Sequence, residues 1–250
     1  MYEAVHAHPD GQSTAARFAM TAERYGYDGV VVRADDARPD YDRLRDSLPV
    51  DVVDAAEIVA PDLQHASGAV GNARPKHTVV IVAGGTSALN RFAVEQQRVD
   101  ILARPFEGVV DAGTAGDGGR TGRNDNGNGD VNHVLAKAAR DNDVRIEVNL
   151  GPALRARGGQ RVRHLSKLRK LKRLLDHYDT PYVVSANPIS HLQLRAPREV
   201  AAVGAEIGLG REWTRDGIDE WGRLVARNRE RRSESFIAPG VERGRYEEDD

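Results

Sequence analysis

Thr78-Val79-Val80-Ile81-Val82 is the stretch of sequence that decides the fold, because an unbroken apolar, β-branched run is typical of a strand buried on both faces. Similar short runs occur at Tyr2–Val5, Asp28–Val32, Val50–Val53, Asp100–Leu102, Arg145–Val148 and Tyr182–Ser185. Amphipathic stretches separate them, among them Thr14–Tyr25, Ser87–Gln97, Val131–Asn142 and Pro197–Ile207. This alternation predicts an α/β protein with a parallel sheet. Seven or eight such units close most simply into a TIM-like (β/α) barrel, although an open doubly wound sheet has the same local pattern.

The chain is long enough for one hydrophobic core, since it has 250 residues and 40% of them are hydrophobic. We expect a single barrel domain over residues 1–228, in which Trp221 is a core anchor because apolar residues recur around it at helical spacing. Segment 111–130 is dominated by Gly, Asp, Asn and Thr, which predicts a disordered surface loop. The highly charged residues 229–250 predict a flexible tail.

The composition excludes several classes of protein. The chain has no cysteine, so neither a disulfide nor a thiolate metal site can form. The sequence contains no apolar run of ~18 residues and no secretion or lipidation signal. These features predict a soluble, cytoplasmic protein that has no membrane partner.

One segment, residues 151–175, departs from the charge balance of the rest of the chain. It carries nine Lys and Arg and no Asp or Glu, whereas the whole chain has a net charge of −2. At about 100° per residue, the leucines between Leu165 and Leu175 fall on one side of a helix and the cations fall on the other. We expect the leucines to pack on the barrel and the cations to face outward. Arg155 and Arg157, just upstream, are expected in a flexible loop at the carboxyl end of a strand.

The cations of this helix call for an anionic partner. Arg163 and Lys167, and then Arg169 and Arg173, stand four residues apart, where like charges repel by a few tenths of a kcal/mol. Phosphate suits these side chains because the guanidinium of Arg offers paired donors to its oxygens. An acidic protein partner would satisfy the same requirement, and an ordinary solvated face remains the alternative without a binding function.

Five runs in the second half of the chain keep a defined order and approximate spacing between about residues 99 and 209. They are Val131–Ala139 (VNHVLAKAA), Val148–Leu154 (VNLGPAL), Arg161–Leu168 (RVRHLSKL), Val183–Pro188 (VVSANP) and Leu194–Glu199 (LRAPRE). This pattern resembles the archaeal and eukaryotic ribonuclease P protein component 3 family. The amino-terminal third matches that family mainly in its alternating pattern.

The resemblance implies a barrel-like fold and a place in the ribonucleoprotein that removes the 5′ leader from precursor tRNA. In that family the RNA is the catalyst and works with magnesium, while the protein supplies neither a cofactor nor a catalytic residue. The implied partners are the ribonuclease P RNA, a second small protein subunit and other ribonuclease P proteins, with precursor tRNA as the substrate of the holoenzyme. The residues expected to contact RNA or a partner protein are Arg155, Arg157, Arg161, Arg163, Lys167, Arg169, Lys170, Arg173, Arg195 and Arg198.

His6 and His8 support an alternative function, that of a metal-dependent phosphoesterase. Two histidines at i and i+2 of a strand point the same way and suit zinc or manganese. The fold is similar in outline to the histidinol-phosphatase type of phosphoesterase barrel, whose first strand ends with such a pair. Glu57 and His77 are available as further ligands, but Ser185-Ala186-Asn187 stands where that resemblance would want an Asp and a His.

Overall fold

The computed structural model of the chain describes residues 1–33, 39–106, 130–233, 236–238 and 241–242, and all seven predicted strands are present in it. The strands of the main sheet are β1 (Tyr2–His6), β2 (Gly29–Arg33), β3 (Asp51–Ile58), β4 (Val79–Ala83), β5 (Ile101–Ala103), β6 (Arg145–Asn149) and β7 (Tyr182–Ser185). The helices are α1 (Ala15–Tyr25), α2 (Tyr41–Ser47), α3 (Leu63–Ala73), α4 (Ser87–Glu95), α5 (His133–Asp141), α6 (Gly151–Arg155), α7 (Gly158–Tyr178), the 3-10 helix η1 (His191–Gln193), α8 (Pro197–Glu206) and α9 (Arg211–Arg231). A short antiparallel pair, β8 (Phe236–Ala238) and β9 (Val241–Glu242), follows α9.

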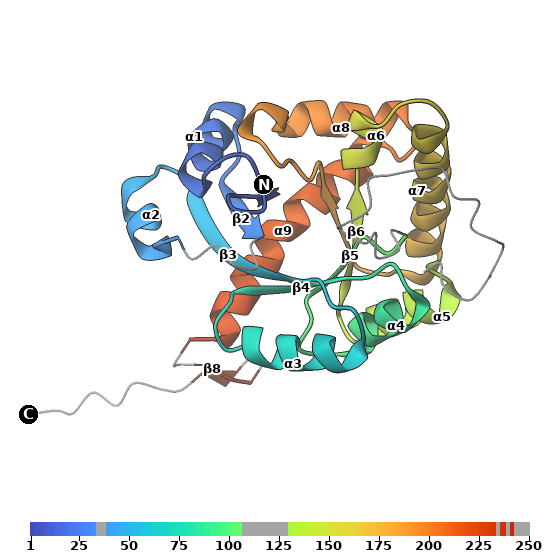
Figure 1. Cartoon of the computed structure of the whole chain (residues 1–250), viewed down its shortest axis with the longest axis horizontal. Coiled ribbons are helices and arrows are strands. Elements are labelled where there is room, and N and C mark those ends of the chain that lie inside the picture. Colours follow the sequence, from blue (N-terminus) through green and yellow to red (C-terminus); the bar gives the residue numbers. More distant parts are fainter. Residues whose placement is uncertain (34–38, 107–129, 234–235, 239–240, 243–250) are drawn as a thin grey trace, which may run out of the picture.

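The seven strands form a nearly closed parallel barrel. Each strand pairs in parallel with the one that follows it in the chain, from the Tyr2↔Gly29 pair to the Asn149↔Ser185 pair. A doubly wound sheet would reverse this order part of the way along, so the barrel prediction is confirmed and the open sheet is excluded. Between β1 and β7 the structure has only isolated bonds, such as the one that His6 N donates to the Pro188 carbonyl at 3.0 Å. Figure 1 shows helices on both sides of the curved sheet.

Helix α9 fills the interior of the barrel beside the gap between β1 and β7 (Figure 1). Alternate residues of the strands point inward, where they form a buried cluster with Trp221, Leu224 and Val225 of α9. The indole Nε1 of Trp221 donates to the carbonyl of Val184 at 3.0 Å. The predicted core role of Trp221 is therefore confirmed, and α9 supplies the packing that an eighth strand supplies in a closed barrel.

Local sequence explains where several helices begin and end. The side chains of Thr86 and Asn132 accept hydrogen bonds from the first turns of α4 and α5. Pro197 is the first residue of α8, as its fixed φ angle predicts. Gly26 ends α1 at φ 82°, a left-handed conformation that glycine adopts without strain.

The predicted loop and tail fall largely outside the described residues. Of the segment 111–130, only Asp130 lies in the described part of the chain. The predicted domain boundary at residue 228 lies within α9, which continues to Arg231. Within the described ranges, no helix combines the length and the apolar character that a membrane span requires.

Candidate functional site

Helix α7 carries most of the predicted contact residues and is packed as its sequence pattern predicts. Leu168, Leu171 and Leu175 are buried against the barrel, while the cations lie on the exposed side. The prediction that Arg155 lies in a flexible loop is wrong, because that residue is the last one of the short helix α6. Pro152 in the first turn favours this helix.

Two of the predicted arginines form hydrogen bonds that connect elements of the fold. The guanidinium of Arg155 donates to the carbonyls of Ala186 and Asn187 at 3.0 and 2.9 Å, and so ties α6 to the segment after β7. Arg169 Nε donates to the carbonyl of Ile207 at 2.9 Å, which joins α7 to the end of α8. These side chains have structural contacts that the charge pattern of the sequence could not show.

Two of the predicted lysines also have neighbours within the chain. Lys170 forms an ion pair with Asp130. The ammonium of Lys167 lies 5.6 Å from the centroid of the Phe106 ring, in a cation–π arrangement. Both side chains remain exposed, so these contacts leave room for a further partner.

The remaining cations of this region face solvent without a carboxylate. Arg157, Arg161, Arg163 and Arg173 are exposed, and none forms an ion pair with another residue of the described structure. Three of them cluster at the amino end of α7, which has no side-chain cap and no acid in its first turn. Because a helix amino end already carries partial positive charge, this end of α7 should attract anions strongly.

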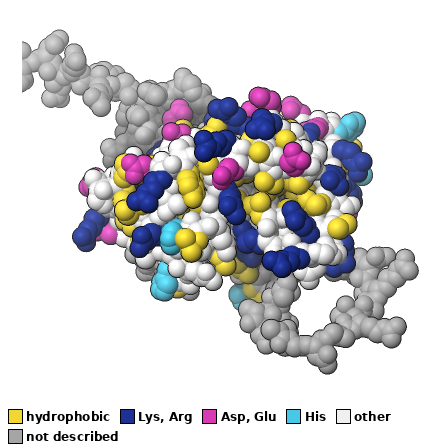
Figure 2. Space-filling view, turned by 90° about the horizontal axis from the view of Figure 1, so that it is seen from above, with side chains coloured by type: hydrophobic (Ala, Val, Ile, Leu, Met, Phe, Trp, Pro, Cys, Tyr) yellow, Lys and Arg dark blue, Asp and Glu magenta, His cyan; other side chains and the backbone are white. Residues whose placement is uncertain are grey.

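Arg195 and Arg198 lie on either side of the first residue of α8, as predicted. Both side chains are exposed, and the structure pairs neither with a carboxylate among the residues it describes. The backbone carbonyl of Arg195 accepts a hydrogen bond from the Tyr27 hydroxyl at 2.8 Å, which holds the segment just before α8 in place. Figure 2 shows the face that contains α8, where Lys and Arg side chains are spread between apolar patches.

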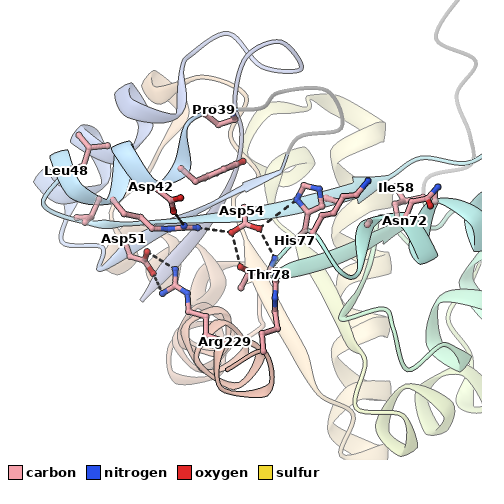
Figure 3. A pocket seen from close by; sticks show the side chains of 18 of the residues that line it. Pro39, Asp42, Leu48, Asp51, Asp54, Ile58, Asn72, His77, Thr78 and Arg229 are labelled. Carbon is pink, nitrogen blue, oxygen red and sulfur yellow. Dashed lines mark hydrogen bonds and ion pairs between the residues drawn. The ribbon is translucent and has the colours of Figure 1, made fainter. Parts of the chain in front are cut away.

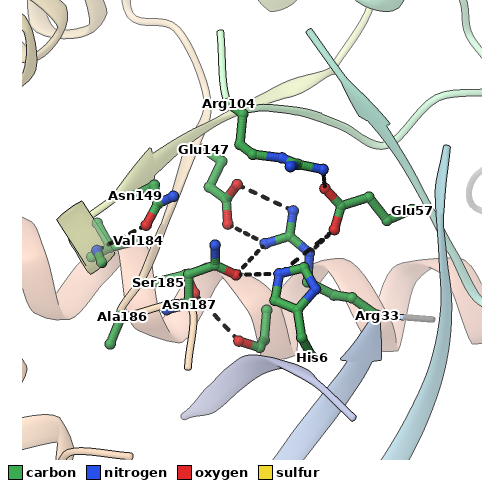
Figure 4. A network of polar contacts seen from close by, with 12 residues as sticks. His6, Arg33, Glu57, Arg104, Glu147, Asn149, Val184, Ser185, Ala186 and Asn187 are labelled. Atoms are coloured by element: carbon green, nitrogen blue, oxygen red, sulfur yellow. Dashed lines mark hydrogen bonds and ion pairs between the residues drawn. The ribbon is translucent and has the colours of Figure 1, made fainter. Parts of the chain in front are cut away.

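A second polar cluster lies at the carboxyl ends of the strands and has Arg33 at its centre (Figure 4). The fully buried guanidinium of Arg33 lies 2.9 Å from the Glu57 carboxylate and donates to Glu147 at 2.5 and 3.2 Å. Arg104 forms a further ion pair with Glu57. These four residues form a charge-balanced network of ion pairs at the mouth of the barrel, in which two guanidinium groups face two carboxylates.

The charges of this network fix the ionisation of Glu57 and His6. Burial alone would raise the pKa of Glu57, but Arg33 and Arg104 lower it to about 2. Burial and the nearby guanidinium of Arg33 lower the pKa of His6. The imidazole Nε2 of His6 lies 2.7 Å from Asn187 Oδ1 and 3.7 Å from Glu57, so His6 belongs to the same cluster.

The predicted phosphoesterase ligands are not brought together. His6 and Glu57 are close, but the guanidinium of Arg33 lies between the carboxylates that a cation would bridge. His8 is exposed beyond the end of β1, and His77 precedes β4, where its Nδ1 lies 3.9 Å from Asp54. The described residues contain no group of three or more His, Cys, Asp and Glu side chains suited to holding a metal ion. The structure therefore does not favour the metal-dependent alternative.

A groove lies on the outside of the barrel, beside α2, β3, α3 and the end of α9 (Figure 3). Its volume is about 1460 Å³. Two ion pairs lie in it, Arg45 with Asp54 at 2.8 Å and Arg229 with Asp51 at 2.7 Å. Three aspartates and four Lys and Arg side chains line the groove, so it has little excess charge with which to select an ionic ligand.

Sequence reasoning missed Arg33, Arg104, Glu147 and Asn187. The signal that was available is positional, because Arg33 and Asn187 lie at or just after the carboxyl end of a strand, whereas Glu147 lies within β6. Barrel proteins place their polar sites at that end. The pairing of Arg33 with Glu57 depends on the inward direction of both side chains, which the residue types alone do not specify.

Comparison with known proteins identifies the family. The family model described as RNase P subunit p30 matches residues 1–116 and 121–233 of the chain. The chain belongs to the ribonuclease P subunit p30 family. Among curated p30 relatives, the protein named Ribonuclease P protein component 3 from Halorubrum lacusprofundi is 56% identical, and the match covers 100% of both chains. The protein of that name from Haloarcula marismortui is 51% identical over 96% of each chain.

Solved structures show the same fold. A chain of an archaeal ribonuclease P structure with mature tRNA superimposes with a TM-score of 0.76 and 21% identity, over 100% of both chains. A prolidase in complex with N-methylphosphonate-L-proline has a TM-score of 0.55 and 8% identity, over 90% of this chain and 74% of that one. These likenesses confirm the barrel. Since the p30 match begins at residue 1, membership also extends to the amino-terminal third, where the sequence showed only an alternating pattern.

Proposed function

We propose that this chain is a protein subunit of ribonuclease P, the ribonucleoprotein that removes the 5′ leader from precursor tRNA, and that it supports the catalytic RNA. The observation that carries the proposal is the exposed, unpaired set Arg157, Arg161, Arg163 and Arg173 on a member of the p30 family. An RNA backbone supplies the anions that this surface lacks, and paired guanidinium donors match its phosphate oxygens.

A noncatalytic role for the protein is supported by the barrel mouth. Phosphoesterase barrels hold metal ions with carboxylates and imidazoles at the ends of their strands, and the metal activates the attacking water. Here the carboxylates of Glu57 and Glu147 are neutralised by the guanidinium groups of Arg33 and Arg104. The chain thus belongs to an endoribonuclease holoenzyme in which the chemistry resides in the RNA.

The partners that fit this role are the ribonuclease P RNA, a second small protein subunit and the other ribonuclease P proteins. Precursor tRNA is the substrate of the assembled particle, and magnesium serves the RNA. The relatives named Ribonuclease P protein component 3, and the solved archaeal ribonuclease P with mature tRNA, support this assignment. The cytoplasmic location predicted from the sequence is part of the same proposal.

Reconstitution tests the proposal. The purified chain alone should leave precursor tRNA intact, and leader removal should appear when the RNA, the companion proteins and magnesium are combined with it. The triple variant Arg161→Ala, Arg163→Ala and Arg173→Ala should weaken assembly with RNA, more strongly at low salt than at high salt, because each lost phosphate contact lowers the salt slope by about 1.

A control separates the effect of these positions from a general change of charge. Arg91 on α4 and Arg98 just after it are exposed and lie outside α7, and their replacement by glutamine should leave assembly unchanged. An unchanged far-UV circular dichroism spectrum would show that both variants fold. Full activity of a particle that lacks the chain, or normal assembly by the triple variant, would refute the proposal.

A further inference from the structure

A second surface with unpaired arginines lies in a pocket where the carboxyl end of α1 meets the amino ends of α8 and α9. Its volume is about 560 Å³, in the range of pockets that hold small ligands. The charged side chains that line this α1–α8–α9 pocket are Arg24, Arg198, Arg211, Arg215, Glu23 and Glu212. Only Arg198 belongs to the set predicted from the sequence.

The cations of this pocket outnumber its acids and have no carboxylate partner. None of the four arginines forms an ion pair within the described structure, and all four are exposed. Arg211 and Arg215 stand four residues apart on α9, where like charges repel. The groove beside α2 differs in this respect, since two of its arginines, Arg45 and Arg229, are paired with aspartates. An anion in the α1–α8–α9 pocket would relieve a repulsion that the protein itself leaves in place.

The helix ends add to the positive field of the pocket. Both α8 and α9 begin there; no side chain caps the first turn of α9, whereas at α8 the Glu199 carboxylate accepts from the Ala196 backbone N at 3.1 Å. The first N–H groups of a helix have no partner within it and favour a bound anion. Met1 also lines the pocket, but its amino group is already paired with Asp28, so it adds little to the attraction.

The pocket is within reach of the same RNA element as α7. Arg169 of α7 bonds to Ile207 at the carboxyl end of α8, and the pocket lies at the other end of that helix. α8 has 10 residues, so it spans about 15 Å. The two basic surfaces are therefore joined by one helix, and a folded RNA can contact both.

We propose that the α1–α8–α9 pocket binds a phosphate of the RNA backbone, as a contact separate from the α7 surface. The inference rests on the proposed function, since the RNA is that of the ribonuclease P particle. Arg198, Arg211 and Arg215 supply the paired donors, and the amino end of α9 supplies backbone amides. The contact adds a second anchor that fixes how the barrel is oriented on the RNA.

Directed cleavage of the RNA tests the placement, because the chain has no cysteine and a single introduced thiol is unambiguous. An iron–EDTA group would be attached at Glu23→Cys in the pocket, at Ser166→Cys on the exposed face of α7, and at Gln97→Cys after α4 as the control. In the reconstituted particle, we expect the pocket and α7 tethers to cut the RNA at separate positions. The control tether should not cut it.

The double variant Arg211→Gln and Arg215→Gln measures the contribution of the pocket. We expect a several-fold loss of affinity for the RNA and a salt slope smaller by about 1 to 2. The control pair Arg91→Gln and Arg98→Gln removes the same charge elsewhere and should change neither. Combined with the α7 triple variant, the fold-losses should multiply, as they do for independent sites.

The outcomes distinguish the two proposals. If the α7 tether cuts RNA while the pocket tether does not, the pocket inference is overturned and the proposed function stands. If neither tether cuts and the α7 variant assembles normally, the proposed function itself fails. Saturation of the pocket by inorganic phosphate, without RNA cleavage from Glu23→Cys, would assign it to a free anion and overturn the inference. Binding of an acidic companion protein that is lost in the double variant, with RNA affinity unchanged, would overturn it as well.

Discussion

Arg33 holds two buried carboxylates together at the mouth of the barrel, through contacts of 2.9 Å to Glu57 and 2.5 Å to Glu147. The change Arg33→Met keeps an unbranched side chain and removes the charge. Removing one partner of a buried ion pair leaves the other charge without compensation and costs about 3–5 kcal/mol. We expect a loss of this size in the free energy of unfolding, measured by urea denaturation at pH 7.

The dependence of this loss on pH identifies its cause. Although burial alone would raise the pKa of Glu57, Arg33 and Arg104 hold it near 2, so the stability that Glu57 contributes is present above its ordinary pKa of 4.5 and is lost as the pH falls toward 2. Without Arg33 the carboxylates take up protons more readily, so the gap between variant and wild type should narrow from pH 7 to pH 5. A gap independent of pH would show that Arg33 acts through packing alone.

The stability that Glu3 contributes changes with pH in the opposite direction to that of Glu57. Burial raises its pKa to about 7, even though Ser185 Oγ and Ala186 N donate to its carboxylate at 2.6 and 2.9 Å. The folded state therefore favours the protonated acid, and the associated stability is present below pH 4.5 and lost as the pH rises through 7.

Glu3→Gln should remove this fall of the free energy of unfolding with rising pH, because the amide cannot ionise. Between pH 5 and pH 8, we expect the free energy of unfolding of the wild type to fall by on the order of 2 kcal/mol more than that of the variant. Urea denaturation at the two pH values measures both slopes. Equal slopes would show that Glu3 keeps an ordinary pKa in the folded protein.

At the scale of single residues, the sequence predicted the exposed cations but not the contacts of every one. Arg163 and Arg173 form no ion pair among the residues that the structure describes, as their like-charged neighbours suggest, whereas Arg155 and Arg169 donate to backbone carbonyls. Spacing along a helix gives the direction of a side chain. Whether an acceptor of another element lies within reach depends on the tertiary fold.

At the scale of elements, helix α9 packs Trp221, Leu224 and Val225 against the inward-facing residues of the strands. Trp221 is fully buried between α9 and the strands, so Trp221→Ala removes a large packed surface and should cost about 3–5 kcal/mol. Chemical denaturation monitored by circular dichroism would measure the loss. The control Leu192→Ala alters a side chain that is 79% exposed and should stay within about 0.5 kcal/mol of the wild type. Equal, small effects at both positions would contradict the interior placement of α9.

The strands and several helices were predictable because their signals are local. Buried parallel strands are continuous apolar runs, and all seven were found in this way. The position of α9 was not predictable, because a period of 3.6 residues indicates a helix and its apolar face without indicating what that face covers. The short helix α6 was not predicted, because the glycines that flank it indicate a loop, although Pro152 favours the start of a helix.

At the scale of the whole molecule, we expect the folded chain to be independent of divalent cations. Arg33 and Arg104 already supply positive charge to the barrel mouth, so removal of metal with EDTA should leave the thermal unfolding midpoint unchanged. Scanning calorimetry before and after dialysis would measure it. A lower midpoint that manganese restores would return His6 and Glu57 to consideration as ligands.

The family and the barrel were both predictable, because the order of the five runs and the βα alternation extend over long stretches of chain. The α1–α8–α9 pocket was not, since its arginines come from α1 near the amino terminus and from α8 and α9 near the carboxyl terminus. Only the closure of the barrel brings Arg24 near Arg198 and Arg211.

The placement of α9 also affects how the protein is made. Ribosomes build the chain from its amino terminus, so all seven strands are synthesised before Trp221. Until that helix emerges, the inward-facing valines lack the surface they pack on in the finished protein. The interior of the barrel can therefore be completed only after synthesis has passed α9.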